Sequence, residues 1–194
     1  MKNKSIFYLM GALRDGNFDV RRGKNYEVRI YQKHRDWLYE VAKIISENYN
    51  VEPKISGNLL RLNNKTVIEK MIADSEYKKP QKFWETPTIV KEGTEDEKWE
   101  YISGFWDADG GLPRDPNNVT QKYISFSQKS KETLEFIKGF LMTQGIKTTN
   151  LTYTGQIWQI RITRKDAIQK FYAHLRSRNR EKLNRLKMLI ASLS

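Results

Sequence analysis

Two acidic residues at matched places in the chain are the strongest candidates for chemistry. Asp15 and Asp109 each follow an apolar helical stretch and precede a glycine, in FYLMGALRDGNF (7–18) and YISGFWDADGGL (101–112). A carboxylate at the C-terminal end of a helix faces the negative end of the helix dipole, which costs about 0.3–1 kcal/mol. Because neighbouring carboxylates also repel, a cation between them would offset both costs.

Small residues in the same two segments indicate that the acids lie close together. Gly11 and Ala12 in the first segment, and Ser103 and Gly104 in the second, would let two helix backbones approach. A pseudo-twofold axis between the helices would then place the two carboxylates side by side. Hard oxygen ligands select Mg²⁺, Mn²⁺ or Ca²⁺, so the two carboxylates together would form a site for one of these ions.

The composition excludes several other chemistries. The chain has no cysteine and two histidines, His34 and His174, among 194 residues. Disulfides, thiol nucleophiles, Cys-ligated zinc and iron–sulfur clusters are therefore excluded. The 35 Lys+Arg against 23 Asp+Glu leave a net charge of +12, which in a folded domain points to a polyanion, most commonly nucleic acid. The charge alone does not exclude an RNA-binding or ribosomal protein.

Hydropathy predicts a folded intracellular protein without a membrane partner. The 38% hydrophobic and 12% aromatic residues are enough for a core and exclude a disordered polycation. No apolar run approaches the about 20 residues of a membrane helix. The N-terminal apolar segment before Arg14 is also too short for a signal peptide.

An internal repeat covers nearly the whole chain. The two Asp-Gly segments are 94 residues apart. RIYQKHRDWLYEVAKII (29–45) matches SFSQKSKETLEFIKGFL (125–141) at an offset of 96, and NNKTVIEKM (63–71) parallels TRKDAIQKF (163–171) at 100. An offset that drifts so little indicates a duplicated unit with small loop insertions.

Each unit reads as helix, strand, strand, helix, strand, strand, helix. In the first unit we expect strands around 18–23 and 26–32, a helix at 35–49, a hairpin turning at Gly57 and a helix at 65–73. In the second we expect strands within 111–128, a helix at 130–144, a hairpin turning at Gly155, and helices at 164–176 and about 179–192. The glycine after each motif acid is expected to end its helix in the left-handed conformation.

The predicted fold class is therefore α+β, with two pseudo-twofold αββαββα units. The first unit spans residues 1–73 and the second spans 98–194. The stretch 74–97, rich in Pro, Glu and Lys, is expected to be the linker between them.

One face of each predicted sheet is apolar and the other is polar. Apolar and polar residues alternate in YEVRIYQ (26–32) and in QIWQIRITR (156–164). Long polar side chains on such a face are the ones that read base edges in the major groove, although a solvated sheet face would look the same. The candidates for DNA contact are Arg21, Arg22, Arg29, Tyr31, Lys33, Arg61, Lys122, Tyr123, Ser125, Lys129, Gln159, Arg161 and Thr163.

The two Asp-Gly segments also carry a resemblance to a known family. YISGFWDADGG (101–111) resembles the signature of the LAGLIDADG homing endonucleases, and YLMGALRDG (8–16) resembles a degenerate first copy, as in the monomeric, two-motif branch. The resemblance implies a DNA-binding saddle of β-sheets and a metal-dependent endonuclease that cuts both strands of a long asymmetric target. It implies Mg²⁺ or Mn²⁺ as the cofactor, with Ca²⁺ binding without supporting cleavage.

The resemblance further implies an intron- or intein-encoded protein. Such a protein would work in the cytoplasm or nucleoid of a prokaryote, or in the organelle that encodes it. Its own intron RNA is a further partner that the family allows, because some members are RNA maturases.

Residue roles follow from the same resemblance. The last acid of each motif binds metal in the family, which implies that role for Asp15 and Asp109. In related proteins the residue that ends the second strand, just before a lysine, is a functional residue. The resemblance therefore implies water-organising roles for Gln32 and Gln128, which stand at that place. No motif identifies the basic residue near the scissile phosphates. The candidates are Lys182 or a neighbouring arginine in SRNREKLNRLK (177–187) for the second unit and, more weakly, Lys82 for the first.

The first motif departs from the family pattern. Its glycine precedes the acid by four residues, whereas the second motif has five. If the acids are aligned, Met10 takes the place of the packing glycine and Leu13 that of the first motif acid. In the second motif that first acid is Asp107, for which we expect a structural role.

Two alternative functions would use the same fold, and a third alternative is a nuclease site elsewhere in the chain. A maturase would bind intron RNA, and a non-catalytic regulator would bind DNA with decayed acids, although retention of both motif acids argues against decay. A second nuclease pattern, Asp96-x-Lys98 with Asp74 upstream, is weak. Asp96 lies where a helix should begin, and acids are favoured there by the helix dipole.

Overall fold

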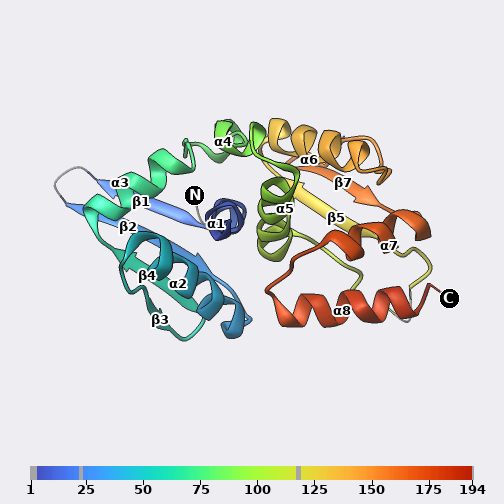
Figure 1. The fold of residues 1–194 in the computed structure, drawn as a ribbon, viewed down its shortest axis with the longest axis horizontal. Helices are drawn as coiled ribbons and strands as arrows, with labels where there is room; N and C mark the ends of the chain where they lie inside the picture. Colours follow the sequence, from blue (N-terminus) through green and yellow to red (C-terminus); the bar gives the residue numbers. More distant parts are fainter. Residues whose placement is uncertain (1–3, 22–23, 117–118, 194) are drawn as a thin grey trace.

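The computed structural model describes residues 4–21, 24–116 and 119–193 of the chain. Two halves of similar build flank a central pair of helices, α1 (Ser5–Ala12) and α5 (Glu95–Asp109), as Figure 1 shows. Each half carries an antiparallel sheet, which confirms the α+β class. Within the described part of the chain, no helix is long and apolar enough to cross a bilayer.

The first half has the element order expected from the sequence. After α1 and a 3₁₀ turn, η1 (Leu13–Asp15), come β1 (Asn17–Arg21), β2 (Asn25–Tyr31), α2 (Arg35–Tyr49), β3 (Lys54–Ser56), β4 (Leu59–Asn63) and α3 (Lys65–Asp74). The strands form one sheet in the order β1-β2-β4-β3.

The second half repeats this order with a reduced first strand. After α5 come β5 (Ile124–Gln128), α6 (Lys131–Thr143), β6 (Thr152–Tyr153), β7 (Trp158–Ile162), α7 (Lys165–His174) and α8 (Arg180–Ala191). The sheet order is β5-β7-β6, and the expected earlier strand is only a single bridge between Gly111 and Ser125. Pro113 and Pro116 lie where that strand would continue, and proline cannot donate a ladder hydrogen bond.

The linker is shorter and more structured than the expected 74–97. It contains η2 (Gln81–Phe83) and α4 (Thr88–Lys91), and α5 already begins at Glu95. A capping box starts α5, because the Thr94 hydroxyl accepts from the Glu97 N–H while the Glu97 carboxylate accepts from the Thr94 N–H at 2.7 Å.

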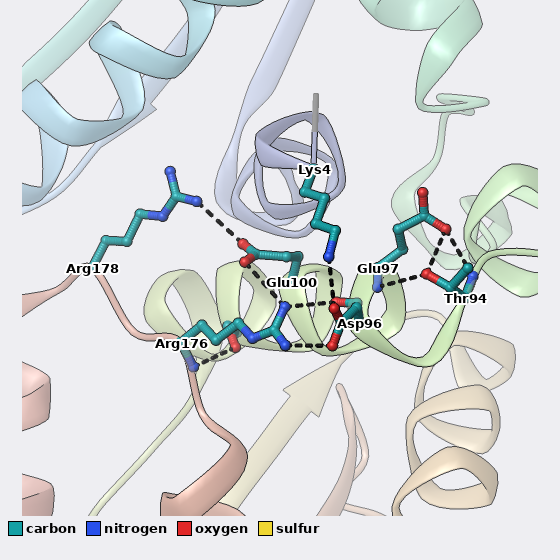
Figure 2. Close-up of polar contacts among 8 residues, drawn as sticks. Lys4, Thr94, Asp96, Glu97, Glu100, Arg176 and Arg178 are labelled. Atoms are coloured by element: carbon teal, nitrogen blue, oxygen red, sulfur yellow. Dashed lines mark hydrogen bonds and ion pairs between the residues drawn. The ribbon is translucent and has the colours of Figure 1, made fainter. Parts of the chain in front are cut away.

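Ion pairs tie the segment before α8 to α5. Figure 2 shows Arg176 and Arg178 reaching from that segment to Asp96 and Glu100, with ion-pair distances of 2.6, 3.4 and 3.2 Å. Hydrogen bonds from Lys4 and Arg176 lower the pKa of Asp96 to about 2. Asp96 thus lies in the first turn of α5, as expected from the helix-dipole argument, and its carboxylate pairs with Lys4 and Arg176.

The two sheets have the expected faces. Val28 and Ile30 of β2, and Ile160 and Ile162 of β7, are fully buried in the core. That core runs through both halves and across the α1–α5 pair. Both halves are therefore held by one hydrophobic core, and the remaining face of each sheet is available to a ligand.

Backbone contact between α1 and α5 requires glycine on both helices. A Cβ on Gly11 would lie 2.1 Å from the carbonyl oxygen of Tyr101, and a Cβ on Gly104 would lie 2.0 Å from that of Tyr8. Gly11 is therefore the packing glycine of the first motif. The expectation that Met10 takes this place is wrong.

The 3₁₀ turn η1 explains how the first motif can be one residue shorter. From Gly11 to Asp15 the chain makes one α-helical step and three 3₁₀ steps. These steps advance about 7.5 Å along the axis, as do five α-helical steps from Gly104 to Asp109. The two acids therefore stand equally far beyond their packing glycines, and the rotation about the helix axis is only about 40° smaller in the first motif than in the second.

The glycines that follow the motif acids do not adopt the expected left-handed conformation. Gly16 has φ −81° and Gly110 has φ −69°, both extended. Gly110 is needed for space instead, because a Cβ there would lie 2.2 Å from the Trp106 ring. The turn glycines Gly57 and Gly155 do have positive φ, at 57° and 86°, as expected for tight hairpins.

Replacement of Gly104 by alanine tests the helix contact. We expect Gly104→Ala to lower the free energy of unfolding by about 3 kcal/mol or more, because the new methyl group would overlap backbone that cannot yield. Gly139→Ala in the middle of α6 is the matched control. Nothing lies within 4 Å of its Cβ, so it should be neutral or stabilising by up to about 1 kcal/mol. Similar unfolding curves for the two variants would contradict the packing described.

Candidate active site

The ends of the two motif helices bring Asp15 and Asp109 into one open cavity of about 790 Å³. Both carboxylates are half-buried. The cavity is also lined by Gln128 at the end of β5 and by residues of the linker. The structure thus places the two sequence-predicted acids together, from opposite halves of the chain.

The two acids disfavour each other's charge. Burial and the negative charge of Asp109 raise the pKa of Asp15 to about 7, against an opposing effect of Lys182. Burial also raises the pKa of Asp109, while Lys182, Arg14 and a hydrogen bond from Gln128 act in the opposite direction. Without a further cation, the pair therefore tends to retain a proton near neutral pH.

This donor set fits a divalent ion. Mg²⁺ is usually bound by one or two carboxylates, with waters and substrate phosphates completing its shell. Within the described residues, no group of three or more His, Asp or Glu side chains gathers in a way that could hold a metal alone. Asp15 and Asp109 would therefore supply the protein ligands, and the remaining oxygens would come from water and substrate.

Lys182 caps the end of α5 beside the acids. Its ammonium donates to the carbonyl oxygens of Trp106, Ala108 and Gly110 at 2.9, 3.2 and 2.8 Å. A cation at this helix end offsets the dipole that disfavours Asp109. Burial lowers the pKa of Lys182 to about 8, although the neighbouring acids oppose that shift. The structure places this predicted basic residue at the site, with its three N–H donors engaged by the helix end.

Asp107 fixes the segment that positions Lys182. Its buried carboxylate accepts hydrogen bonds from Tyr8, Ser177, Arg178 and Asn179. The last three belong to the extended segment before α8, and the Asn179 side chain caps that helix. Asp107 thus holds the start of α8 against the second motif, in line with the structural role expected of it.

The two predicted glutamines are not equivalent. The Gln128 amide donates to Asp109 Oδ2 at 3.1 Å, and its oxygen accepts from the Lys129 N–H at 2.7 Å. The Gln32 oxygen accepts from the Lys33 N–H in the same way, at 3.1 Å, but Gln32 is not part of the cavity lining. The structure therefore brings only Gln128 to a motif acid.

The polar face of the first sheet carries interlocked charges. Arg29 and Arg61 both pair with Glu27, at 2.9 and 2.7 Å, which explains how a carboxylate can be buried on this face. Arg21 pairs with an acid of its own strand. Two further candidates on or beside this face, Tyr31 and Lys33, are exposed. Arg22 lies outside the described residues.

The second sheet carries a comparable but smaller network. Gln159 donates to Ser127 at 3.0 Å and accepts from Arg161 at 2.9 Å, and the Arg161 guanidinium lies 4.7 Å from the ring centroid of Tyr123. Lys129 is exposed and Thr163 is half-buried. These side chains are preorganised on the face opposite the core.

Two DNA-contact candidates are engaged within the protein. Ser125 is 6% exposed and pairs with Gly111 through the backbone. The Lys122 ammonium donates to the carbonyl oxygen of Ser192. Alternation alone could not detect these contacts, because it does not show which group of the protein lies opposite each side chain.

Sequence reasoning missed the residues that the linker brings to the cavity. Lys79 and Gln81 line it, whereas Lys82, the predicted basic residue of the first half, does not and lies with its ammonium 4.9 Å from the ring centroid of Phe83. Arg14 also lines the cavity. The available signal was that Arg14 stands where the second motif has the small residue Ala108.

Comparison with known proteins identifies the family. A model of the LAGLIDADG-like domain matches residues 96–176. Homing endonuclease I-ApeI of Aeropyrum pernix is 30% identical over 205 residues, which cover 98% of this chain and 89% of that protein. The chain belongs to the LAGLIDADG homing endonuclease family. The family match begins in α5, which carries the better preserved of the two LAGLIDADG motifs.

Solved LAGLIDADG structures share the fold. The structure of I-DmoI in complex with DNA and Mn has a TM-score of 0.65 and 21% identity, and covers 90% of this chain and 99% of that chain. I-WcaI bound to its DNA recognition sequence has a TM-score of 0.64 and 15% identity, with 93% and 86% covered. Both likenesses extend over the two halves together.

The raised pKa of Asp15 predicts that metal binding competes with a proton. Because this acid is protonated below about pH 7, the affinity of the protein for Mn²⁺ should fall as the pH is lowered from 8 to 6. Electron paramagnetic resonance of free Mn²⁺ would measure it. Asp15→Asn should bind Mn²⁺ more weakly and with less pH dependence. An affinity that is constant across this range would contradict the described coupling of the acids.

Proposed function

We propose that this protein is a metal-dependent homing endonuclease that cuts both strands of DNA at a specific site. The observation that carries the proposal is the meeting of Asp15 and Asp109, one from each LAGLIDADG motif, in one cavity. It is supported by the 30% identical relative, which is named a homing endonuclease. It is also supported by structures of I-DmoI with DNA and Mn or Ca, and of a variant of I-DmoI with its target DNA and Mg.

The chain's own residues divide the work at the site. Asp15 and Asp109 would hold the metal ion, which when bound supplies Lewis-acid stabilisation of the phosphate and an acidified water. Gln128 orients Asp109, and its second amide N–H is available to a water or a phosphate oxygen. Lys182 adds a fixed positive charge beside the scissile phosphates.

The two sheets would bind the target on their polar faces. The net charge of +12 favours a DNA backbone, and arginines held by acids on the sheets are poised to donate to base edges. The described halves differ, because one sheet has four strands and the other three. A single chain with two unlike halves should read a long asymmetric site and act as a monomer.

The biological setting is inferred from the family alone. We expect an intron- or intein-encoded protein that works where its target DNA lies, in the cytoplasm or nucleoid of a prokaryote or in an organelle. Binding of its own intron RNA stays a prediction.

Replacement of either motif acid tests the function. The protein is incubated with a plasmid library and Mg²⁺, and the cut site is mapped and then used for all variants. Asp15→Asn and Asp109→Asn should each lower cleavage of both strands by orders of magnitude, because each removes a charge that holds the metal. DNA affinity without divalent ions should be unchanged or higher, since less negative charge faces the phosphates.

Asp166→Asn is the control for this replacement, because Asp166 is an exposed acid at the start of α7 that pairs with Arg164. Its cleavage rate should equal that of the wild type. Normal cutting by Asp15→Asn while Asp109→Asn fails would contradict the two-acid mechanism.

The salt dependence of binding tests the DNA-binding surface. If the sheets and their flanks neutralise about 6–10 phosphates, log K should fall with log salt at a slope of about −0.9 per contact. Fluorescence anisotropy with Ca²⁺ and labelled target would measure this slope. A slope shallower than about −3 would be inconsistent with contact along both sheets.

A further inference from the structure

Arg14 is an unusual residue for its position. It immediately precedes the motif acid Asp15, where the second motif has Ala108. Its side chain is fully buried, at 0% exposure, although it is charged. A buried guanidinium is retained only where several partners satisfy it.

The partners of Arg14 come from the linker and from α6. Nη1 donates to the carbonyl oxygen of Glu85 at 3.1 Å, and Nη2 donates to the carbonyl oxygen of Trp84 at 2.5 Å and to Thr133 Oγ1 at 2.6 Å. The guanidinium also lies 4.3 Å from the ring centroid of Trp84. The Arg14 carbonyl accepts from the Gln81 amide at 2.9 Å. The first motif thus contacts the linker through three hydrogen bonds and the Trp84 ring.

The segment that Arg14 holds is one wall of the cavity. Tyr77, Lys79, Gln81 and Trp84 line it together with the two motif acids. The Lys79 ammonium donates to the carbonyl oxygen of Phe18 at the start of the first sheet. The linker therefore contributes a cation and an amide to the part of the cavity formed by the first half, since Lys79 bonds to Phe18 and Gln81 to Arg14.

The second half uses the opposite charge for the same task. There the buried Asp107 accepts hydrogen bonds from the backbone N–H groups of Arg178 and Asn179, and so fixes the segment that carries Lys182. In the first half the aligned residue is Leu13, which cannot accept such bonds. Arg14 instead donates to backbone carbonyl groups of the linker, the segment that follows the closing helix of its own half.

We propose that Arg14 is a positioning residue for the half of the active site that contains Asp15. It replaces the missing first acid of the degenerate motif, and it holds the linker so that Lys79 faces the scissile phosphate of one DNA strand. The inference rests on the proposed endonuclease function. It predicts a defect mainly in the cleavage of one strand, because Lys79 and Gln81 are bonded to the first half, at the carbonyl oxygens of Phe18 and Arg14.

Single-turnover cleavage with differently labelled strands tests this role. Arg14→Lys keeps the positive charge but loses the two guanidinium nitrogens that donate to the linker. At saturating enzyme and Mg²⁺, this variant should cleave one strand at least tenfold more slowly and the other less than threefold more slowly. Affinity for the target in Ca²⁺ should change less than threefold. Lys79→Met should slow the same strand. The double variant should be no slower than the slower single variant, because Arg14 acts through the linker.

Two further variants separate positioning from stability. Ile68→Val removes a methylene group from the core of the same half and should lower the melting temperature without strand bias. Thr133→Val removes one partner of Arg14 and should slow the same strand by about two- to fivefold. Thr133→Val therefore tests the positioning role of Arg14 even if Arg14→Lys does not fold.

Equal slowing of both strands, or additive effects of Arg14→Lys and Lys79→Met, would overturn the inference. So would a Thr133→Val variant without strand bias. If the wild-type protein cuts no DNA at all, the proposed function itself fails, and the inference falls with it.

Discussion

The direct contact between the backbones of α1 and α5 is the constraint on which the rest of the structure depends. Gly11 and Gly104 leave no room for a side chain between the two helices. This contact aligns two helix ends that come from opposite halves of the chain, and it joins both halves in one hydrophobic core. The acids at those ends can share a cavity only because the helices meet this closely. Catalysis and folding therefore depend on the same pair of glycines.

Such an arrangement concentrates unfavourable charge, and the surrounding residues compensate for it only in part. Two helix C-termini and two carboxylates converge, and burial raises the pKa of both acids. Lys182 binds the end of α5, and Gln128 donates to Asp109. Among the described residues, no glutamine donates to Asp15 in this way, and Lys182 opposes the rise in the pKa of Asp15 only in part. The negative charge that remains uncompensated at the site is what the proposed metal ion would neutralise.

Most of the fold could be predicted from the sequence, because local patterns and the repeat specify the elements. The helix expected at 35–49 has those bounds in the structure, since its apolar spacing is regular and is interrupted by no proline or glycine. The two acids were predicted because the Asp-Gly segment occurs at matched places in the two halves of the repeat. Features that depend on contacts between distant segments could not be predicted. The close approach of Gly11 to Tyr101, which makes Gly11 rather than Met10 the packing residue, is one, and the hydrogen bonds from Arg14 to the linker are another.

The central claim is that one acid from each half contributes to a single metal-dependent site. Anomalous diffraction from Mn²⁺ in crystals of the protein bound to its mapped target tests it most directly. We predict anomalous peaks in the cavity whose ions contact the carboxylates of both Asp15 and Asp109. Peaks bound to only one of these acids, or at a site away from both, would contradict the account.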